Sequence, residues 1–439
     1  MQTRRSFLKG VAVTAAGIAA PMIVPSKVLG AEAPSNRITV GMIGVGRQAR
    51  YANLPQLLAV PDAQVVAVCD VDSWRVEQAK VLVEEAYAKH AGTPYSGCAT
   101  FGDFRELLAR DDIDAVMIST PDHWHVPAGI AAAKAGKHFS CEKPLSTCVA
   151  HGRMLCEAAK KAGVVTRTDS EFRSLRVMQQ AVECVRNGRI GKLQRIHSNS
   201  PEDTKPVGNP EAMPVPAELN YDLWLGPAKD APYTEQRVHA PHVLKERPGW
   251  LRISDYTNGM IANWGSHLND IVQWAHNSDR TGPVSVQGTG QFSEGLWDTI
   301  VDFDATYEYA DGVVLNYTMG GDPSIRFEGS DGWVSVKYPE TIEASAPEIL
   351  NEPLGAGELN LKDTLSDKAD FIHAIKIGGE TLEPLEVGHR TVSLCQIGLI
   401  AIQCGRRLRW DPDKERFPDD EEANAKLDRE MRGDWAKWT

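Results

Sequence analysis

The sequence lacks both the long apolar runs and the excess of positive charge that mark two large classes of protein. Its 439 residues contain no run of about 18 apolar side chains, the length that a membrane-spanning helix needs, so no stable membrane span is expected. The 47 Lys and Arg residues are outnumbered by 59 Asp and Glu, for a net charge of -12. Because binding to phosphate backbones depends on clustered basic residues, this balance argues against a nucleic acid and favours a small-molecule partner.

Paired cysteines and metal-site spacings are also missing. The 8 cysteines are scattered, with no C-x-x-C and no His/Cys cluster at the spacing of a zinc site, so we expect no metal. Most of these cysteines are expected to be buried apolar side chains, and whether any of them pair stays open. The composition, 42% hydrophobic and 24% charged, supplies enough apolar side chains for a full core, and the length favours two or three domains.

The N-terminal segment, residues 1–30, has the pattern of an export signal. Residues 3–9, T-R-R-S-F-L-K, precede an Ala- and Gly-rich apolar stretch at 10–24, and small residues at 28–31 suit signal peptidase. A membrane anchor is the alternative, but Pro21 interrupts the stretch, Pro25 follows it, and it has little Leu, Ile or Phe. The pattern predicts twin-arginine export to the periplasm. Because proteins that use this route fold before they cross, it also predicts a tightly held cofactor.

After this segment a buried strand leads directly into a glycine-rich turn. Residues 38–43 are largely apolar, and residues 44–49 match G-x-G-x-x-A, a turn at which the backbone can approach a dinucleotide pyrophosphate. A second strand ends at Asp70, about 20 residues beyond the turn, where a carboxylate can accept hydrogen bonds from the adenosine ribose. Its charge disfavours a 2′-phosphate, so NAD is expected rather than NADP. The charges of Arg47 and Arg75 are expected to be solvated.

Helices and strands continue to alternate up to about residue 170. Strands are expected at 115–119, 138–140 and 164–166, and helices at 104–109, 127–135 and 150–162. This alternation predicts an α/β Rossmann domain with a doubly wound sheet. Later strand-like segments, at 193–198, 284–291, 299–307, 313–319 and 333–336, predict an α+β domain with a large, mostly antiparallel open sheet. The expected division is a signal at 1–30, a dinucleotide-binding domain at 31–170 and a substrate and oligomerisation domain at 171–439.

Two further motifs follow the strands of the first domain. T-P-D-H-W-H, at residues 120–125, follows the third strand, and C-E-K-P, at residues 141–144, follows the next one. Together with the glycine turn they resemble the Gfo/Idh/MocA oxidoreductases, in particular the exported bacterial branch of that family. The resemblance implies a tightly bound NAD, a carbohydrate substrate received on the face of the second sheet, and a homo-oligomer.

The resemblance also implies a catalytic role for Lys143 of the E-K-P motif. This lysine is expected to reach the substrate hydroxyl beside the nicotinamide, where an ammonium stabilises a developing alkoxide. The family's second signature, D-x-G-x-H-x-x-D, is matched by residues 263–270, which makes His267 the acid/base and Asp270 its support. Asn263 replaces the first aspartate of that signature and cannot take a proton. Lys143 and His267 are therefore expected to handle the proton. Asn263 is also expected to belong to the catalytic site, on the same helix face as His267.

The glycine turn and the resemblance together assign the rest of the site. The expected cofactor contacts are Gly44, Gly46, Arg47, Gln48, Asp70, Thr120, Pro121, His125, Glu142 and Lys143. Glu142 is also expected to orient Lys143. The expected substrate contacts are Arg173, Asp270 and Trp250.

Three functions are compatible with these motifs. The favoured one is an NAD-dependent oxidoreductase that acts on a sugar, polyol or glycoside carbinol by hydride transfer. Since no ready dinucleotide pool exists outside the cytoplasmic membrane, such an enzyme would oxidise one substrate and reduce another in one site. The alternative is an NAD-dependent glycoside hydrolase that uses transient C3 oxidation, elimination and hydride return. A non-catalytic carbohydrate-binding protein is the least favoured, because the motif residues are intact.

Overall fold

Two β-sheets organise the part of the chain that the structure describes. The structure is a computed structural model, and it describes residues 36–203, 207–362 and 364–433. The expected export signal, residues 1–30, lies outside the described residues. The helices and strands all belong to one compact unit that begins at Ile38. No helix in these described ranges is both long enough and apolar enough to cross a membrane.

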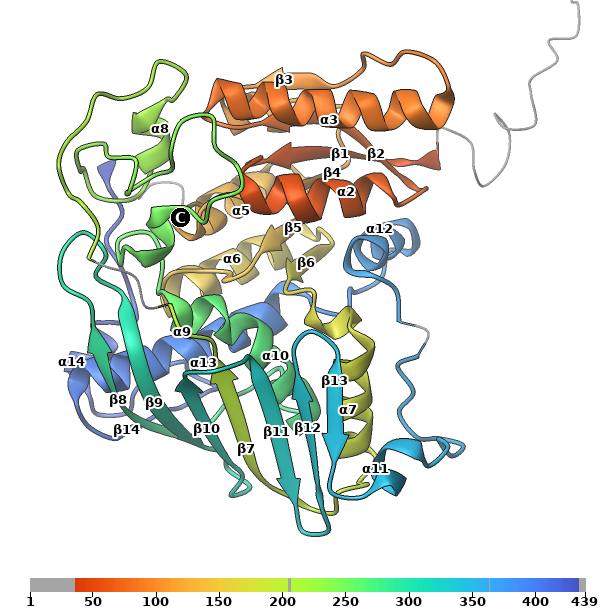
Figure 1. The fold of residues 1–439 in the computed structure, drawn as a ribbon, viewed down its shortest axis with the longest axis vertical. Coiled ribbons are helices and arrows are strands. Elements are labelled where there is room, and N and C mark those ends of the chain that lie inside the picture. The colour runs from red at the N-terminus through yellow and green to blue at the C-terminus, as the bar shows by residue number, and fades with distance from the viewer. Residues whose placement is uncertain (1–35, 204–206, 363, 434–439) are drawn as a thin grey trace, which may run out of the picture. The chain divides into compact units, whose positions relative to one another are not determined.

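The first sheet has 6 strands in the order β3-β2-β1-β4-β5-β6, all of them parallel (Figure 1). Its strands are β1 (Ile38–Ile43), β2 (Ala63–Cys69), β3 (Ala99–Phe101), β4 (Ala115–Ile118), β5 (His138–Glu142) and β6 (Thr166–Asp169). This confirms the predicted Rossmann sheet. The strand order reverses between β1 and β4, which opens a crevice at their carboxyl ends.

Helices cover both faces of this sheet, which is why its central strands β1, β2 and β4 are so apolar. The covering helices are α2 (Leu54–Leu58), α3 (Ser73–Ala91), α4 (Phe104–Leu108), α5 (His125–Lys134) and α6 (Val149–Ala162). One further helix, α12 (Asp367–Ile377), comes from the segment expected to belong to the second domain. Its Phe371 and Ile372 are buried in the same apolar cluster as Val40 and Met42 of β1. The first sheet therefore draws part of its cover from far along the chain.

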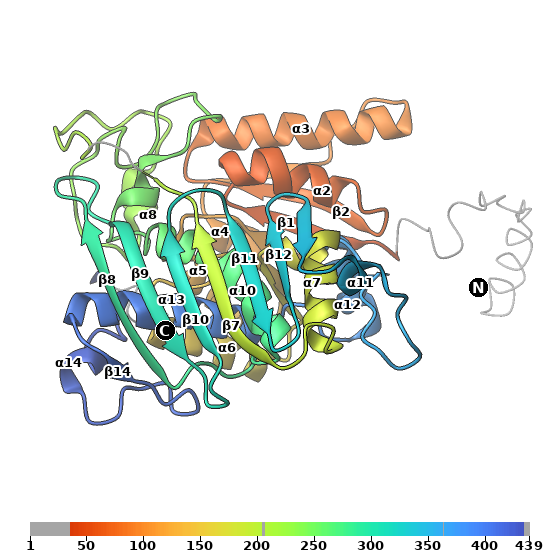
Figure 2. The same cartoon turned by 60° about the horizontal axis from the view of Figure 1, so that its bottom comes forward.

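The second sheet has 8 strands in the order β13-β12-β11-β7-β10-β9-β8-β14 (Figure 2). Its strands are β7 (Leu193–Ser200), β8 (Ser285–Phe292), β9 (Ile300–Glu308), β10 (Val314–Met319), β11 (Ser324–Gly329), β12 (Trp333–Lys337), β13 (Thr341–Ala344) and β14 (Leu408–Arg409). Only β7 and β10 pair in parallel, and the other neighbours are antiparallel. The predicted α+β architecture is thus confirmed, although β11, β13 and β14 of this sheet, and β3 and α3 of the first domain, were not anticipated from the sequence.

One face of the second sheet is covered and the other is open. From Asp302 onward strand β9 alternates, with Phe303 and Tyr307 buried and Asp302 and Asp304 exposed. The covering helices are α7 (Arg176–Arg186), α10 (Gly265–His276) and α13 (Leu385–Cys404), whose apolar side chains share a single cluster with the strands. Such alternation is typical of an antiparallel sheet that packs on helices with one face only.

The loop-rich segment between β7 and β8 forms a small cluster of its own. It contains α8 (Tyr221–Leu225), the turn η6 (Gly249–Arg252) and α9 (Met260–Asn263), and its core is made of aromatic and aliphatic side chains. An isolated bridge joins Leu219 to Asp72, just beyond β2, and so attaches this segment to the first domain. The 8 cysteines are all free and 7 of them are buried, as expected for apolar side chains.

Candidate active site

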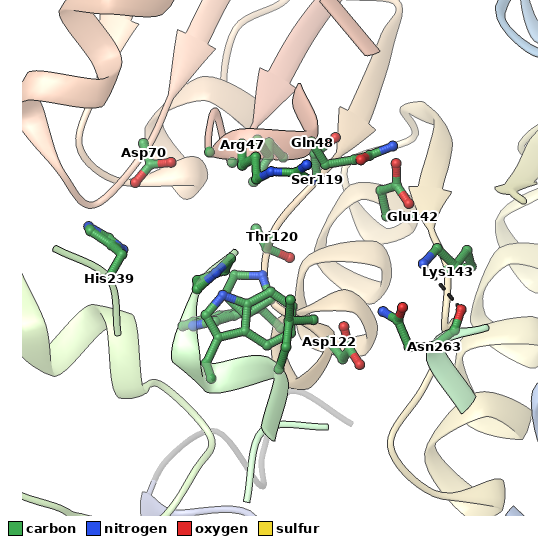
Figure 3. A pocket seen from close by; sticks show the side chains of 18 of the residues that line it. Arg47, Gln48, Asp70, Ser119, Thr120, Asp122, Glu142, Lys143, His239 and Asn263 are labelled. Atoms are coloured by element: carbon green, nitrogen blue, oxygen red, sulfur yellow. Dashed lines mark hydrogen bonds between the residues drawn. The ribbon is translucent and has the colours of Figure 1, made fainter. Parts of the chain in front are cut away.

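A cavity of about 530 Å³ lies at the carboxyl ends of the central strands of the first sheet (Figure 3). That volume is in the range of small-molecule sites. Most of the predicted site residues line it, namely Gly44, Gly46, Arg47, Gln48, Asp70, Thr120, Pro121, Glu142, Lys143, Trp250, Asn263 and His267. Asp70 lies toward one end of the cavity and Lys143 with Asn263 toward the other (Figure 3). Two chemically distinct regions therefore share one space.

The glycine turn is shaped by close backbone contact. Gly44 has φ 84°, and a Cβ on it would lie 2.7 Å from the carbonyl carbon and oxygen of Ser119 and from the amide nitrogen of Thr120. At Gly46 a Cβ would meet nothing closer than Arg75, at 3.8 Å. Gly44 is thus required by the packing of two strand-to-helix turns, while Gly46 leaves the backbone accessible from the cavity. This arrangement fits a pyrophosphate held by backbone amides.

Asp70 is fixed by its own backbone neighbourhood. Its Oδ2 accepts a hydrogen bond from the Val45 amide at 2.8 Å, and its Oδ1 accepts one from the Asp72 amide at 3.0 Å. Burial raises the pKa of the Asp70 carboxyl, while the charge of Arg75 opposes that rise. The carboxylate lines the cavity, where it suits the ribose hydroxyls of an adenosine.

Arg75 is buried, which corrects the expectation that its charge is solvated. Only 5% of it is exposed, and it lies 3.4 Å from Asp72. Its Nη2 donates to the Val243 carbonyl at 2.8 Å, and Arg47 donates through Nε to the Lys245 carbonyl at 3.1 Å. The two arginines hold the loop at residues 239–247 against the cavity mouth, and His239 adds a contact of 3.0 Å to Asp72.

At the other end of the cavity, Lys143 donates from Nζ to the backbone carbonyl of Asn263 at 3.2 Å (Figure 3). Burial lowers the pKa of its ammonium, although the nearby Glu142 and Asp122 carboxylates counter that shift. The Asn263 side-chain oxygen accepts a hydrogen bond from Arg247 at 3.3 Å. Asn263 and His267 both face the cavity, but they lie on two successive helices, α9 and α10, and not on one.

His267 has a defined protonation state. Its Nδ1 contacts the Ser170 carbonyl, which can only accept, so Nδ1 carries the proton and Nε2 has the free lone pair. Its ring stacks on Phe172 at 4.5 Å between centroids. Burial and the charge of Lys143 hold its pKa well below the ordinary value, so the imidazole is neutral at pH 7. A neutral imidazole with an available Nε2 suits a general base.

An aromatic group around His267 was not anticipated from the sequence. Tyr338 stacks on Phe172 with centroids 5.1 Å apart and planes at 8°, and Trp264 lies edge-on to Tyr338 at 5.6 Å. All three rings line the cavity. Tyr338 comes from the turn after β12, far from any motif, so no local signal marked it. Aromatic faces of this kind are suited to packing on sugar rings.

Two predicted substrate contacts are not brought to the cavity. Arg173 and Asp270 do not line it, and they form a buried ion pair with Nη2 to Oδ1 at 2.7 Å and Nε to Oδ2 at 2.8 Å. Their exposed fractions are 1% and 0%. A buried guanidinium needs a carboxylate partner, and Asp270 is that partner for Arg173. Asp270 is therefore not available to support His267. The structure therefore does not support substrate contact for this pair.

His125 and Glu142 also have different partners from those expected. His125 is fully buried outside the cavity lining, where Nδ1 lies 2.7 Å from the Pro144 carbonyl and Nε2 lies 3.0 Å from the Thr120 carbonyl. It joins the two motif loops instead of facing the cofactor region. Glu142 accepts a hydrogen bond from Asn53 at 2.9 Å, and burial raises its pKa to about 8.

One group of three possible metal ligands occurs among the described residues. Cys148, His151 and Asp428 have ligand atoms within 4.8 Å of one another. None of the three lines the cavity. The sequence did not predict the group because Asp428 is remote from the other two along the chain.

Comparison with protein families decides the assignment. Residues 38–170 match the oxidoreductase family, NAD-binding Rossmann fold, and residues 206–437 match the oxidoreductase family, C-terminal alpha/beta domain, both of the Gfo/Idh/MocA type. The chain belongs to the Gfo/Idh/MocA oxidoreductase family. It is thus an enzyme of an oxidoreductase family with an NAD-binding domain, as the motifs predicted.

Curated relatives match only part of this family member. A glycosyl hydrolase family 109 protein of Saccharopolyspora erythraea is 40% identical over 114 residues, 26% of this chain and 24% of that protein. The myo-inositol 2-dehydrogenase of Thermotoga maritima is 35% identical over 166 residues, 37% of this chain and 45% of that protein. The matched part of the chain thus spans less than half the length of either relative.

Solved structures share the fold of this family member at low identity. The WlbA dehydrogenase from Bordetella pertussis, in complex with NADH and UDP-GlcNAcA, has a TM-score of 0.63 and 17% identity, covering 85% of this chain and 99% of that one. The aldose-aldose oxidoreductase from Caulobacter crescentus, complexed with glycerol, has a TM-score of 0.61 and 16% identity, with the same coverage of 85% and 99%. Both likenesses concern the arrangement of the two sheets.

Proposed function

We propose that the protein is an NAD-dependent oxidoreductase that acts on a carbinol of a sugar, polyol or glycoside. The observation that carries this proposal is the single cavity in which the glycine turn and Asp70 lie toward one end, and Lys143 and His267 toward the other. The carbohydrate substrates named for the structural neighbours are consistent with it.

The glycine turn, Asp70 and the loop at 239–247 are the groups that would hold the dinucleotide. When bound, NAD supplies the hydride acceptor for the carbinol. The charge of Arg75 is shared with the Asp72 carboxylate, and Asp70 lies beside it, which favours ribose hydroxyls over the 2′-phosphate of NADP. The contacts of Arg47 and Arg75 to the loop support tight retention of the cofactor.

Lys143 and His267 supply the proton chemistry. A carbinol that loses hydride must also lose its hydroxyl proton, and the neutral Nε2 of His267 can take it. The ammonium of Lys143 stabilises the alkoxide that develops before the proton has fully left. Lys143 donates its hydrogen bond to the backbone carbonyl of Asn263. An aspartate at this position could accept the same bond, so the replacement of the family's aspartate by Asn263 leaves this contact unchanged.

A second candidate is a glycoside hydrolase that passes through a transient keto sugar. The likeness to the glycosyl hydrolase family 109 protein favours it. In this reaction the carbon next to the oxidised carbinol carries an acidified proton, and the neutral His267 is the candidate base for its removal. Water then adds to the carbon that lost the aglycone and the hydride returns to the keto carbon, so the only co-substrate of net hydrolysis is water.

A panel of sugars, polyols and aryl glycosides distinguishes the two candidates. The oxidoreductase proposal predicts a keto product together with reduced cofactor, or a second sugar that is reduced in step with the first. Aglycone release without any net keto product would refute the oxidoreductase proposal and support the hydrolase.

We also propose that the protein is exported to the periplasm through the twin-arginine route and assembles as a homo-oligomer. The twin arginines and apolar stretch of residues 3–24 support export, and the open face of the second sheet supports assembly. Export predicts activity in the periplasmic fraction that is lost when both arginines become lysine. Assembly predicts a mass above that of one chain in light scattering, and a monomer would contradict it.

A further inference from the structure

Glu171 has an unusual backbone conformation at the end of β6. Its φ is 65°, in the left-handed region that residues with a Cβ rarely adopt. It lines the cavity together with Lys143 and His267. Backbone strain of this kind persists only where the surrounding structure demands it, and it is concentrated at functional sites.

The strained backbone bears directly on His267. The carbonyl that accepts the hydrogen bond from His267 Nδ1 belongs to the peptide between Ser170 and Glu171. The next residue, Phe172, is the ring on which His267 stacks. The φ of Glu171 therefore sets the position of that carbonyl relative to that ring, and a change of φ would separate the two groups that fix the imidazole.

The side chain of Glu171 bears on Lys143. Its Oε1 is buried and has no hydrogen-bond partner among the described residues. Burial raises the pKa of this carboxyl, and the titratable groups that face it are Lys143, Lys368, Asp169, Asp367 and Glu142. Of the two cations, Lys368 is already paired with Asp169.

Lys143 in turn has no carboxylate in hydrogen-bond contact in the described part of the chain. Its hydrogen bond goes to a neutral backbone carbonyl. The charged groups that face it are the carboxylates of Glu142, Asp122 and Glu171 and the guanidinium of Arg247. The neutral His267 is also close enough to sense its charge. Of the three acids, Glu142 and Asp122 already accept hydrogen bonds from other residues.

We infer that Glu171 is a positioning residue with two separable parts. Its left-handed backbone holds the Ser170 carbonyl on His267 Nδ1, and its carboxylate is a counter-charge of the Lys143 ammonium beside those of Glu142 and Asp122. The inference rests on the proposed function, in which Lys143 and His267 handle the proton.

Three substitutions separate the two parts. E171Q keeps the shape and removes the charge, E171G removes the side chain but tolerates the left-handed backbone, and E171A removes the side chain and disfavours that backbone. Asp419→Ala is the matched control, because Asp419 is exposed, has φ 57° and does not line the cavity. Dinucleotide content and circular dichroism verify that each variant is folded.

Two readouts need no substrate. Acylation of Lys143 by acetic anhydride, followed by peptide mass spectrometry across pH, reports the fraction of free amine. Nitrogen chemical shifts of labelled histidine report which ring nitrogen of His267 carries the proton. We expect E171Q and E171G to acylate Lys143 about tenfold faster at a fixed pH below its pKa, because a nearby negative charge shifts an amine by about one unit. Both variants should keep the proton on Nδ1.

E171A should show the same faster acylation and also a mixture of His267 tautomers, whereas Asp419→Ala should change neither readout. An unchanged acylation profile in E171Q would overturn the counter-charge part. A single Nδ1 tautomer in E171A would overturn the backbone part. Since neither readout depends on turnover, a wild-type enzyme that oxidises no carbinol would contradict the proposed function and leave these results interpretable.

Discussion

Replacing Gly44 by alanine tests how the dinucleotide turn is built. The new Cβ would lie 2.7 Å from backbone atoms of Ser119 and Thr120, which have no flexible end that could move aside. The residue would also have to keep a φ of 84°. A left-handed conformation costs a residue with a Cβ about 1–2 kcal/mol, and forced overpacking adds about 1–3 kcal/mol. We expect Gly44→Ala to lower the free energy of unfolding by about 3 kcal/mol and to lose the bound dinucleotide.

Gly92→Ala provides the matched control. Gly92 follows α3 with φ 70°, and a Cβ there would meet nothing within 4 Å. In that variant only the left-handed conformation should lower the free energy of unfolding, by about 1 kcal/mol, and the cofactor should be kept. Urea denaturation followed by circular dichroism measures the first quantity, and dinucleotide released on denaturation measures the second. Equal destabilisation of the two variants, with the cofactor retained in both, would refute the packing account of Gly44.

Three other variants test separate parts of the account. Lys143→Met should lower kcat by about 10² to 10³, the usual cost of a lost oxyanion donor, while the cofactor content measured after denaturation stays unchanged. Asp70→Ala should shorten cofactor retention in a dialysis time course. Arg153→Met should lower the unfolding free energy at pH 7 by about 2 kcal/mol, because Arg153 contacts Glu386 at 2.6 Å and Glu415 at 2.8 Å. Arg153 and Arg390 together hold the pKa of Glu386 down to about 2, so urea melts of the wild type should lose this stability as the pH falls from about 4.5 toward 2. Arg153→Met should show a smaller loss, because Arg390 still contacts Glu386 at 2.8 Å.

The parts of the fold and site that were predicted from sequence depend on local signals. Apolar runs marked the strands, and each motif stands immediately after a strand, at residues 44–49, 120–125 and 141–144. The carboxyl ends of parallel strands meet at one edge of a sheet, so motifs that are far apart in the chain converge on one cavity. The glycine turn and Asp70 were found for this reason, whereas the role of Lys143 was predicted from the resemblance of its motif to the Gfo/Idh/MocA family.

The parts that were missed depend on contacts between remote segments. Arg75 looks like a solvated helix residue until the loop at 239–247 folds over it, and nothing near position 75 signals that cover. Arg173 was expected to contact a substrate because the sequence alone does not show whether its guanidinium faces the cavity or pairs with a carboxylate of the protein, here Asp270. Tyr338 joins the aromatic group only because the turn after β12 reaches the end of β6. The left-handed Glu171 likewise has no local sequence signal.

The most direct test of the central claim uses the purified protein with no added cofactor. Denaturation should release close to one NAD per chain, and a carbohydrate from the panel should reduce the bound nicotinamide in a single turnover that Lys143→Met slows by about 10² to 10³. Protein that carries no dinucleotide, binds none when it is supplied, and shows no change in nicotinamide absorbance with any carbohydrate would contradict the claim.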